Sequence, residues 1–504
     1  MAIVTANDVF SCFLFLVWPR SRVPPPPSPL SLPFLGHLHL IGPVLPTSLQ
    51  ALARRHGPLM QLRLGASSCV VASSASIARE ILKTQDVKFA SRPEFASSEH
   101  FIYRGSRFIM APYGDYWRFM KKLCLTRLLG APQLERFLDV REEEVQRLVE
   151  SVIECLRAGK ASDLSKELTT FSNNVICRMM MSTRCSGTEN DAKGIHELVK
   201  ACMELAVKLS VGDILGPLRW LDFSGNGKKL EVVLREFDQI VERIMKQHEE
   251  KLINGSVADR KDLMDIVLET HDDPAAEVKI TRNDIKSFIL DIFLAGTETS
   301  SAAMQWAMAE LINCPEAYKK LQDEIGSVVG PTRLVRESDI PSLPYLRAVV
   351  KETLRLHSPA ALIIRECRED CSVDGYLVEA KSRVLINAYA IMRDPEMWTD
   401  SDVFAPERFL ESSNGKTGEH QREFKDQNFR YLPFGSRRRG CVGASLALSV
   451  MHLGVGSLVQ CFDWKMMEGE EAVDLSQGPG FGAEMAKPLV CYPVVHVDPF
   501  EPCH

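Results

Sequence analysis

Apolar residues recur at helical spacing along most of this chain, and a few short stretches alternate instead. The helical pattern predicts helices at 142–155, 168–181, 195–209, 229–251 and 444–459, and a longer one at 283–313. Strands are predicted at 59–64, 68–72 and 384–388. The pattern therefore predicts several helices and a few short strands.

An apolar segment, Ala2 to Trp18, opens the chain. It is interrupted by polar residues and is shorter than the ~20 residues that span a bilayer. Arg20 and Arg22 follow it and no basic residue precedes it, so the positive-inside rule places the rest of the chain in the cytosol. We expect residues 1–18 to form a membrane anchor. A shallow, peripheral insertion is the alternative.

Prolines dominate the next stretch, Val23 to Pro29. Consecutive prolines enforce an extended, semi-rigid chain, so residues 19–33 are predicted to be a hinge that holds the following domain away from the anchor. A proline-rich ligand for another domain is the alternative. No long Gly/Ser linker divides residues 34–500, and a chain of 504 residues that is 45% hydrophobic can bury a large core. One large domain over residues 34–504 is the prediction.

Charge and cysteine content narrow the function classes. The net charge is −6 and no basic stripe dominates, which argues against a nucleic-acid partner. The 14 cysteines are scattered, and the closest pair, Cys367 and Cys371, lacks the second pair or histidines that would complete a zinc site. We therefore expect reduced thiols and a cytosolic environment.

One cysteine stands apart from the rest. The stretch Phe434 to Gly443 carries three consecutive arginines and places Cys441 just before an apolar helix. A helix N-terminus and neighbouring cations lower the pKa of a cysteine and favour its thiolate. A thiolate is also an axial ligand of haem iron. On its own, a buried structural cysteine is the commoner meaning of such a position.

Two further segments carry polar groups in unusual places. Ala295 to Ser300 puts three hydroxyls, a glycine and an acid inside an apolar helix, and breaks of this kind often mark function. A threonine that bonds back to its own helix explains the segment equally well. Trp117 and Lys121 share one helix face and suit a pair of carboxylates, although an exposed basic face is the simpler alternative.

These segments together resemble the motifs of the cytochrome P450 family. The cysteine loop resembles the haem-binding signature F-x-x-G-x-R-x-C-x-G, in which Phe434, Arg439, Cys441 and Gly443 fit. Position 437 departs from it, because arginine stands where the family has glycine, and Val442 stands where plant members usually have proline. The resemblance implies a cytochrome P450 fold, which is mainly α with smaller β-sheets. It also implies haem b as cofactor and Cys441 as the ligand of its iron.

The other motifs are assigned by the same resemblance. Ala295 to Ser300 resembles the oxygen-activation motif, so that Ala295 and Gly296 lie against the haem while Glu298 and Thr299 handle oxygen and protons. Trp117, Lys121 and Arg365 are implied haem contacts, and the segment Phe481 to Met485 an implied substrate contact. Glu352, Arg355 and Arg408 are implied to form a buried structural triad beneath the haem, because buried charges must be paired.

The style of the chain is similar to plant A-type P450s, in the group of flavone and isoflavone synthases and triterpenoid oxidases. This similarity rests on two stretches, Arg365-Glu366-Cys367 and Gln460 to Trp464. The resemblance implies a monooxygenase of the endoplasmic reticulum membrane with its haem domain in the cytosol, acting on a small apolar metabolite with O2. Electrons would come from NADPH through NADPH-cytochrome P450 reductase. Two rivals stay open: a haem-dependent isomerase or dehydratase, and a non-catalytic relative that binds haem weakly because of Arg437.

Overall fold

A computed structural model describes residues 23–103, 107–184, 190–210, 225–253, 260–410, 428–480 and 484–500. The predicted anchor, residues 1–18, lies outside these residues, as does most of the segment Phe481 to Met485. The helices are α2 (Leu45–His56), α3 (Ala75–Arg79), α4 (Asp115–Leu123), α5 (Ala131–Arg136), α6 (Leu138–Arg157), α7 (Leu164–Met181), α8 (Asn190–Ser210), α9 (Asn226–Ile253), α10 (Leu263–Asp272), α11 (Arg282–Gly296), α12 (Glu298–Asn313), α13 (Pro315–Val328), α14 (Pro344–Leu356), α15 (Ala388–Ile391) and α16 (Ala444–Cys461).

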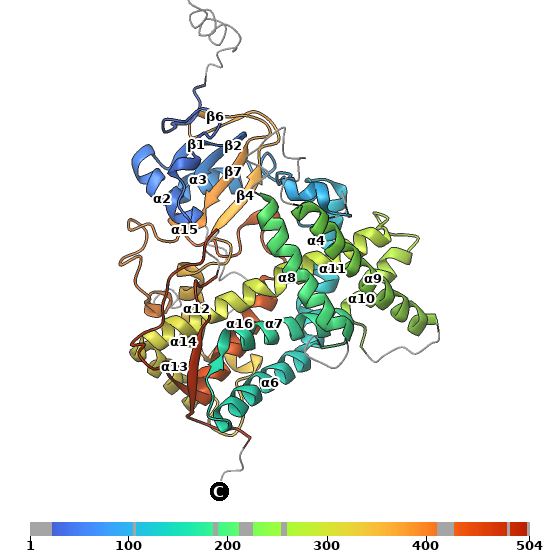
Figure 1. Cartoon of the computed structure of the whole chain (residues 1–504), viewed down its shortest axis with the longest axis vertical. Coiled ribbons are helices and arrows are strands. Elements are labelled where there is room, and N and C mark those ends of the chain that lie inside the picture. Colours follow the sequence, from blue (N-terminus) through green and yellow to red (C-terminus); the bar gives the residue numbers. More distant parts are fainter. Residues whose placement is uncertain are drawn as a thin grey trace, which may run out of the picture.

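Three small sheets accompany the helices. Their strands are β1 (Leu59–Leu64), β2 (Ser67–Ala72), β3 (Ser162–Asp163), β4 (Leu362–Glu366), β5 (Cys371–Val373), β6 (Tyr376–Val378), β7 (Arg383–Asn387), β8 (Phe462–Lys465) and β9 (Val490–Val495). The largest sheet has the order β1-β2-β7-β4, in which β2 and β7 run parallel and the other neighbours antiparallel. It therefore joins strands from both halves of the sequence, and Figure 1 shows it above the helical body. The expectation of a mainly α fold with small sheets is confirmed.

The helical body is built around α12 and α16. In Figure 1 α11 and α12 cross the middle of the molecule, and α16 lies behind them. α16 is apolar all round and long enough to cross a membrane by length and composition, but most of it is buried within the protein, which makes it a core helix. Gly454 lets α16 pack closely, because a Cβ there would come within 2.6 Å of Met304 Sδ on α12.

The proline-rich segment, predicted to be a semi-rigid hinge, makes hydrogen bonds with the domain that follows it. Pro24 O accepts the backbone N–H of Leu377 and Pro27 O that of Gln61, both at 2.8 Å, while Pro29 O lies 2.9 Å from Nε2 of His37. Proline has no N–H to donate but keeps its carbonyl as an acceptor. The described part of the predicted hinge therefore lies against the strands β1 and β6.

Two other expectations need correction. The single helix predicted over 283–313 is two helices that break at Thr297. Cys177 is disulfide-bonded, although all thiols were expected to be reduced. Spacing along the chain does not show which cysteines meet in space.

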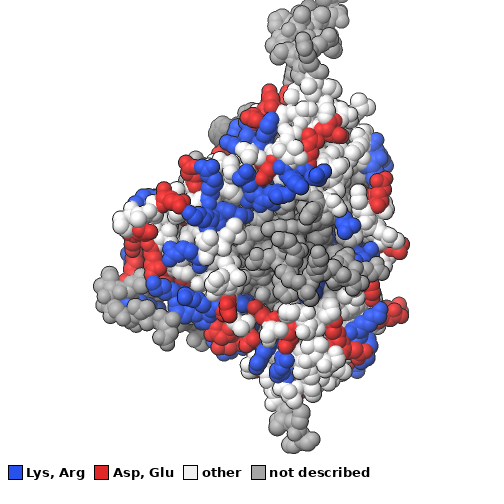
Figure 2. Space-filling view, turned by 180° about the vertical axis from the view of Figure 1, so that it is seen from behind, with Lys and Arg blue, Asp and Glu red and all other residues white. Residues whose placement is uncertain are grey.

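On the face shown in Figure 2, basic and acidic side chains are interspersed over the described surface.

Candidate active site

A cavity of about 410 Å³ lies inside the molecule between α11–α12 on one side and the cysteine loop with the start of α16 on the other. Side chains of α4, α7 and β4 complete its walls. Most of the lining is apolar, and four cations reach it, from Arg92, Lys121, Arg365 and Arg439. None of the described residues that line it is Asp or Glu. The cavity is thus an apolar chamber with a positive region and no counter-charge of its own.

Cys441 is placed in the cavity wall by the turn that precedes α16. Its backbone N–H donates to Phe434 O at 2.9 Å, and Gly440 N–H donates to Arg437 O at 3.0 Å. Gly443 forms the N-cap of α16 and, like Phe434, lines the cavity. The Cys441 side chain is exposed only in the sense that it faces this interior space, since protein surrounds it on the other sides.

The predicted thiolate is not favoured by the protein alone. Burial raises the pKa of the Cys441 thiol, and it outweighs the Gly443 N–H and the cations Lys121 and Arg92, which lower it. The sequence pointed to the run of three arginines as the source of positive charge, and this was wrong. A metal bound at the sulfur removes the proton outright, so the raised pKa is compatible with a ligand role.

The three arginines of the loop have separate roles. Arg437 and Arg438 are exposed, and Arg438 pairs with Asp86 at 3.1 Å and donates to the Tyr113 hydroxyl. Arg439 is buried and donates to the backbone carbonyls of residues 90, 109 and 111. Its guanidinium also lies 4.4 Å from the centre of the Trp117 ring. Arg439 is therefore the residue that ties the loop to the rest of the site.

Arg437 adopts the left-handed conformation that a glycine would accept without strain. Its φ is +57°, and it is among seven non-glycine residues with positive φ in the described chain. The steric penalty of a Cβ in that region is of order 1–2 kcal/mol. Because its side chain points to solvent, the substitution strains the turn without filling the cavity.

Four buried cations share the positive region of the cavity. Burial lowers the pKa of Lys121 to about 8 and of Arg439 to about 9, and burial also lowers the pKa of Arg92 and Arg365. Lys121 Nζ donates to Gly440 O. Arg92 Nε and Arg365 Nη2 have no hydrogen-bond partner among the described residues. An anionic group with more than one carboxylate would satisfy these donors and restore the charge balance.

Arg92 was not predicted from the sequence. It stands in a loop between the first sheet strands and α4, without neighbouring charges that would single it out. Arg365, on β4, is predicted, and the charge of Arg92 adds to the lowering of its pKa, although less than burial does. Their meeting depends on a contact over more than 250 residues, which no local pattern records.

The helix break between α11 and α12 lies at the wall of the same cavity as Cys441. Ala295, Gly296, Thr299 and Ser300 line it. The Thr299 hydroxyl donates to Ala295 O at 2.6 Å, which is the back-bonding that the sequence left open. A side chain at Gly296 would meet Ile176 Cδ1 at 2.9 Å, so its small size serves contact with α7 as well. The bent helix thus leaves a hydroxyl at the cavity surface.

Glu298 is not brought into the cavity. One position before Thr299, it points to another side of the helix and is absent from the lining. Burial raises its pKa, and the nearby Glu484 adds to this effect while Lys200 opposes it. Any role of Glu298 toward the cavity has to pass through other groups.

The charged network of α14 lies behind the site rather than in it. Glu352 accepts two hydrogen bonds from Arg355 and one from Arg408 Nε, the last at 2.9 Å. Glu352 and Arg355 are fully buried. Arg355 also donates to the carbonyls of Met392 and Ser401. The structure brings the three predicted residues together, and the network fastens α14 to the segment that leads to the cysteine loop.

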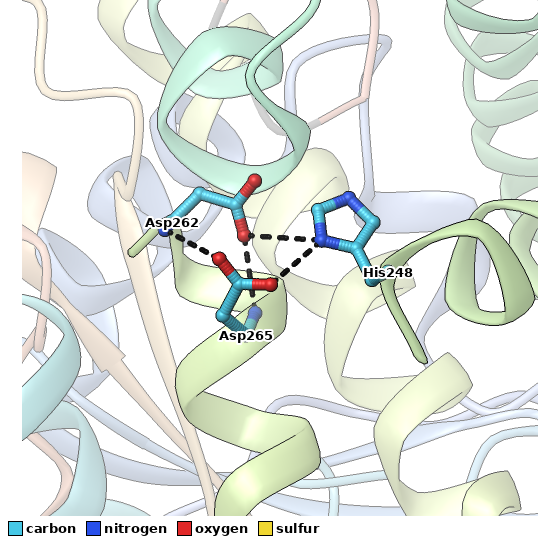
Figure 3. A group of neighbouring side chains, drawn as sticks. All are labelled: His248, Asp262 and Asp265. Carbon is cyan, nitrogen blue, oxygen red and sulfur yellow. Dashed lines mark hydrogen bonds and ion pairs between the residues drawn. The ribbon is translucent and has the colours of Figure 1, made fainter. Parts of the chain in front are cut away.

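A second cluster of ionisable groups lies outside the cavity. His248 of α9 contacts Asp265 at 2.8 Å and Asp262 at 3.7 Å, as Figure 3 shows. Burial raises the pKa of Asp262 to about 6, with His248 opposing it. The two aspartates also form the capping box of α10. The cluster therefore fastens α9 to the start of α10, and its ligand atoms are already used within the protein.

Comparison with known proteins identifies the class. Residues 25–492 match the family model Cytochrome P450. A 3,9-dihydroxypterocarpan 6A-monooxygenase of Glycine max is 41% identical over 97% of this chain and 96% of its own length, and a beta-amyrin 24-hydroxylase of the same plant is 42% identical over 95% and 94%. A zebra fish cytochrome P450 solved with progesterone superimposes with a TM-score of 0.74 at 25% identity, covering 89% of this chain and 97% of that one.

The chain belongs to the cytochrome P450 family, and it is a P450 monooxygenase. Its relatives are plant P450s of the kind that the sequence resembled, and they include oxidases of a pterocarpan and of a triterpene. The family implies a haem cofactor, a small substrate and O2.

The residues of the site fit such a cofactor. A cysteine sulfur faces the cavity opposite the bent helix, as a thiolate ligand of haem iron requires. The donors of Arg92 and Arg365 that lack partners suit the two propionate carboxylates of haem b. The apolar walls suit its macrocycle. The fit rests on these donors and on the cavity, and it is independent of the family match.

Proposed function

We propose that this enzyme inserts one atom of O2 into a small apolar plant specialised metabolite of the flavonoid or triterpenoid kind. The electrons come from NADPH through NADPH-cytochrome P450 reductase. The observation that carries the proposal is the cavity itself, which Cys441, Thr299 and mostly apolar side chains line together.

The site residues take the following roles in this proposal. Cys441 holds the haem iron, while Arg92, Arg365 and Lys121 hold the carboxylates of haem b, with Trp117 and Arg439 packed beside them. Haem, when bound, supplies the activation of O2 that no side chain can provide. Phe434 and Gly443 shape the turn around the sulfur. Each of these groups binds or orients the cofactor.

Proton delivery is assigned to the bent helix. Thr299 is the hydroxyl at the cavity surface, and its oxygen keeps lone pairs free to accept a hydrogen bond while its proton is held by Ala295 O. Glu298 lies outside the cavity, so it acts as a proton source only through groups that lie between. Thr299 is therefore the main residue that we assign to proton delivery.

Substrate class follows from the walls. Phe108, Ile109, Val175, Ile292 and Ala303 are among the apolar side chains of the lining, and burying apolar area is the main driving force they offer to a ligand. The hydroxyls of Ser172 and Ser300 add a little polarity. A neutral, rigid ring system suits this lining better than a charged molecule. The pterocarpan and β-amyrin named in the two relatives are of that type.

Location and organisation are proposed from the N-terminal sequence. Residues 1–18 anchor the chain in the endoplasmic reticulum membrane, residues 19–33 connect it, and residues 34–504 form the haem domain on the cytosolic side. The described prolines at 24, 27 and 29 dock on the domain, so the connection is a short strap rather than a long stalk.

The direct experiment is expression of the full chain with a plant P450 reductase in microsomes. The microsomes are supplied with NADPH and with a panel of flavanones, pterocarpans and pentacyclic triterpenes. The proposal expects products heavier by one oxygen atom, with the label taken from ¹⁸O2 and with no product when NADPH is withheld. Product formed without O2 would favour an isomerase or dehydratase. Label taken from water instead of ¹⁸O2 would contradict the proposal.

A further inference from the structure

A short segment of the cavity wall, residues 107–111, is held by a carboxylate inside the helical body. We call this segment the cavity strip. Phe108 and Ile109 of the strip line the cavity. Asp291, on α11 one turn before Ala295, is fully buried and accepts from the strip with both of its oxygens.

The hydrogen bonds to Asp291 are well suited to fix the orientation of the cavity strip. Arg107 donates from Nε at 3.0 Å and from Nη2 at 2.7 Å to Oδ1, while the backbone N–H of Ile109 donates at 3.0 Å to Oδ2. A guanidinium fork and a backbone amide on one carboxylate leave the strip little freedom to rotate. Arg107 is mostly buried and also lies 4.3 Å over the Phe101 ring.

The far side of the strip is held as well. Arg439 of the cysteine loop donates to the carbonyls of Ile109 and Ala111. Phe108 lies between two aromatic rings, with centroids 6.2 Å from Phe288 of α11 and 6.3 Å from Trp117 of α4. The cavity strip thus connects α11 to the cysteine loop. Its apolar side chains, Phe108 and Ile109, line the cavity.

From this arrangement we propose that Asp291 and Arg107 are positioning residues that determine substrate selectivity. They hold Phe108 and Ile109 as a fixed part of the cavity wall, so the pair sets which bulky apolar molecules fit above the haem. The proposal rests on the proposed function for the cofactor and the cavity. It adds a charged pair that does not line the cavity and therefore touches no substrate.

The test uses azoles that bind the haem iron and shift its Soret band. Imidazole needs only the iron, whereas the bulky apolar azole ketoconazole must also pack on the wall. Variants of the full chain are Asp291→Asn, Arg107→Gln and the double variant. The matched control is Arg282→Gln. Arg282 stands at the start of the same helix α11 and pairs with Glu242 and Glu249 of α9, and none of the three lines the cavity.

The proposal expects each single variant to weaken ketoconazole binding about tenfold, the size expected for losing charge-assisted hydrogen bonds, with imidazole binding changed less than about twofold. The double variant should bind ketoconazole no more weakly than either single variant does, because the two single substitutions remove the same contact. Arg282→Gln should match the wild type for both azoles. Equal loss for both azoles, or no loss for ketoconazole, would overturn the proposal.

A second measurement does not depend on haem. Hydrogen exchange at the amide of Ile109 should be faster in Asp291→Asn and in Arg107→Gln than in Arg282→Gln, because the amide loses its acceptor or the strip loses its clamp. Unchanged exchange would count against the clamp even in protein that binds no azole. A wild type that binds neither azole while its Ile109 amide is protected by Asp291 would instead contradict the proposed function and leave the clamp standing. Should Asp291→Asn fail to fold, Arg107→Gln decides the question alone.

Discussion

Arg355 donates two hydrogen bonds to Glu352, three residues before it on α14, with Nε 2.8 Å from Oε2 and Nη2 2.8 Å from Oε1, and neither side chain reaches solvent. Arg408 Nε reaches the same Oε1, and the backbone N–H of Ala405 reaches it at 3.0 Å. One carboxylate therefore balances two guanidinium groups and joins the helix to a segment more than 50 residues further along the chain.

Glu352→Ala should cost about 3–5 kcal/mol in the free energy of unfolding, because it leaves buried arginines without a counter-charge. Denaturant unfolding of wild type and variant, followed by circular dichroism, measures it. Arg282→Gln serves as control, since its partly exposed pairs should contribute only about 0–1 kcal/mol. A loss for Glu352→Ala no larger than that of the control would mean that the network is not a determinant of stability.

Arg437→Gly should raise the retention of haem on heating without changing which product forms. The gain comes from relief of the positive φ at 437, of order 1–2 kcal/mol. Arg438→Gly is the matched control, because residue 438 is not in the positive-φ region and its loss removes the contact with Asp86. The variant at 438 should retain haem less well than the wild type. A wild type that takes up no haem while Arg437→Gly does would revive the view of a non-catalytic relative.

Thr299→Ala should keep the haem spectrum but release more hydrogen peroxide and less product per NADPH consumed. Thr299 carries the lining hydroxyl nearest in sequence to the helix break, and a group positioned for proton transfer typically contributes about 10²- to 10⁴-fold. Ser172→Ala, which removes another hydroxyl of the lining, should leave the coupling unchanged. Glu298→Gln should act more weakly than Thr299→Ala. Unaltered coupling in Thr299→Ala would remove its assigned role.

Deletion of residues 2–22 should move the protein into the soluble fraction with its haem spectrum intact. The proline carbonyls that accept hydrogen bonds from the domain are those of Pro24, Pro27 and Pro29, and this deletion retains all three. Deletion of residues 2–29 removes the three proline carbonyl acceptors and should lower thermal stability as well. Full retention in the membrane after the shorter deletion would place the anchor elsewhere in the chain.

The sequence predicted the overall fold well because helical spacing and short strands are local properties. Five predicted helical ranges lie within a few residues of α6, α7, α8, α9 and α16, and α16 follows Cys441 as predicted. The cysteine loop, the Trp117–Lys121 face and the Glu352 network were also recognisable, since each rests on a compact motif.

What the sequence did not predict depends on contacts between distant segments. Arg92 joins Arg365 only in the folded chain, and Asp291 meets Arg107 from more than 180 residues away. The pKa of the Cys441 thiol was predicted in the wrong direction, because burial is a property of the whole fold and here outweighs the nearby cations. The break at Thr297 was missed for a related reason: the pattern of apolar residues continues across it.

The central claim is that Cys441 is the ligand of the haem iron, and the carbon monoxide difference spectrum of Cys441→Ala tests it most directly. The account predicts that the reduced wild type gives the thiolate-type Soret band and that Cys441→Ala gives none. The control Cys461→Ala, which removes a buried thiol at the other end of α16, should give the band as the wild type does. An unchanged thiolate-type band in Cys441→Ala would contradict the account, because another residue would then hold the iron.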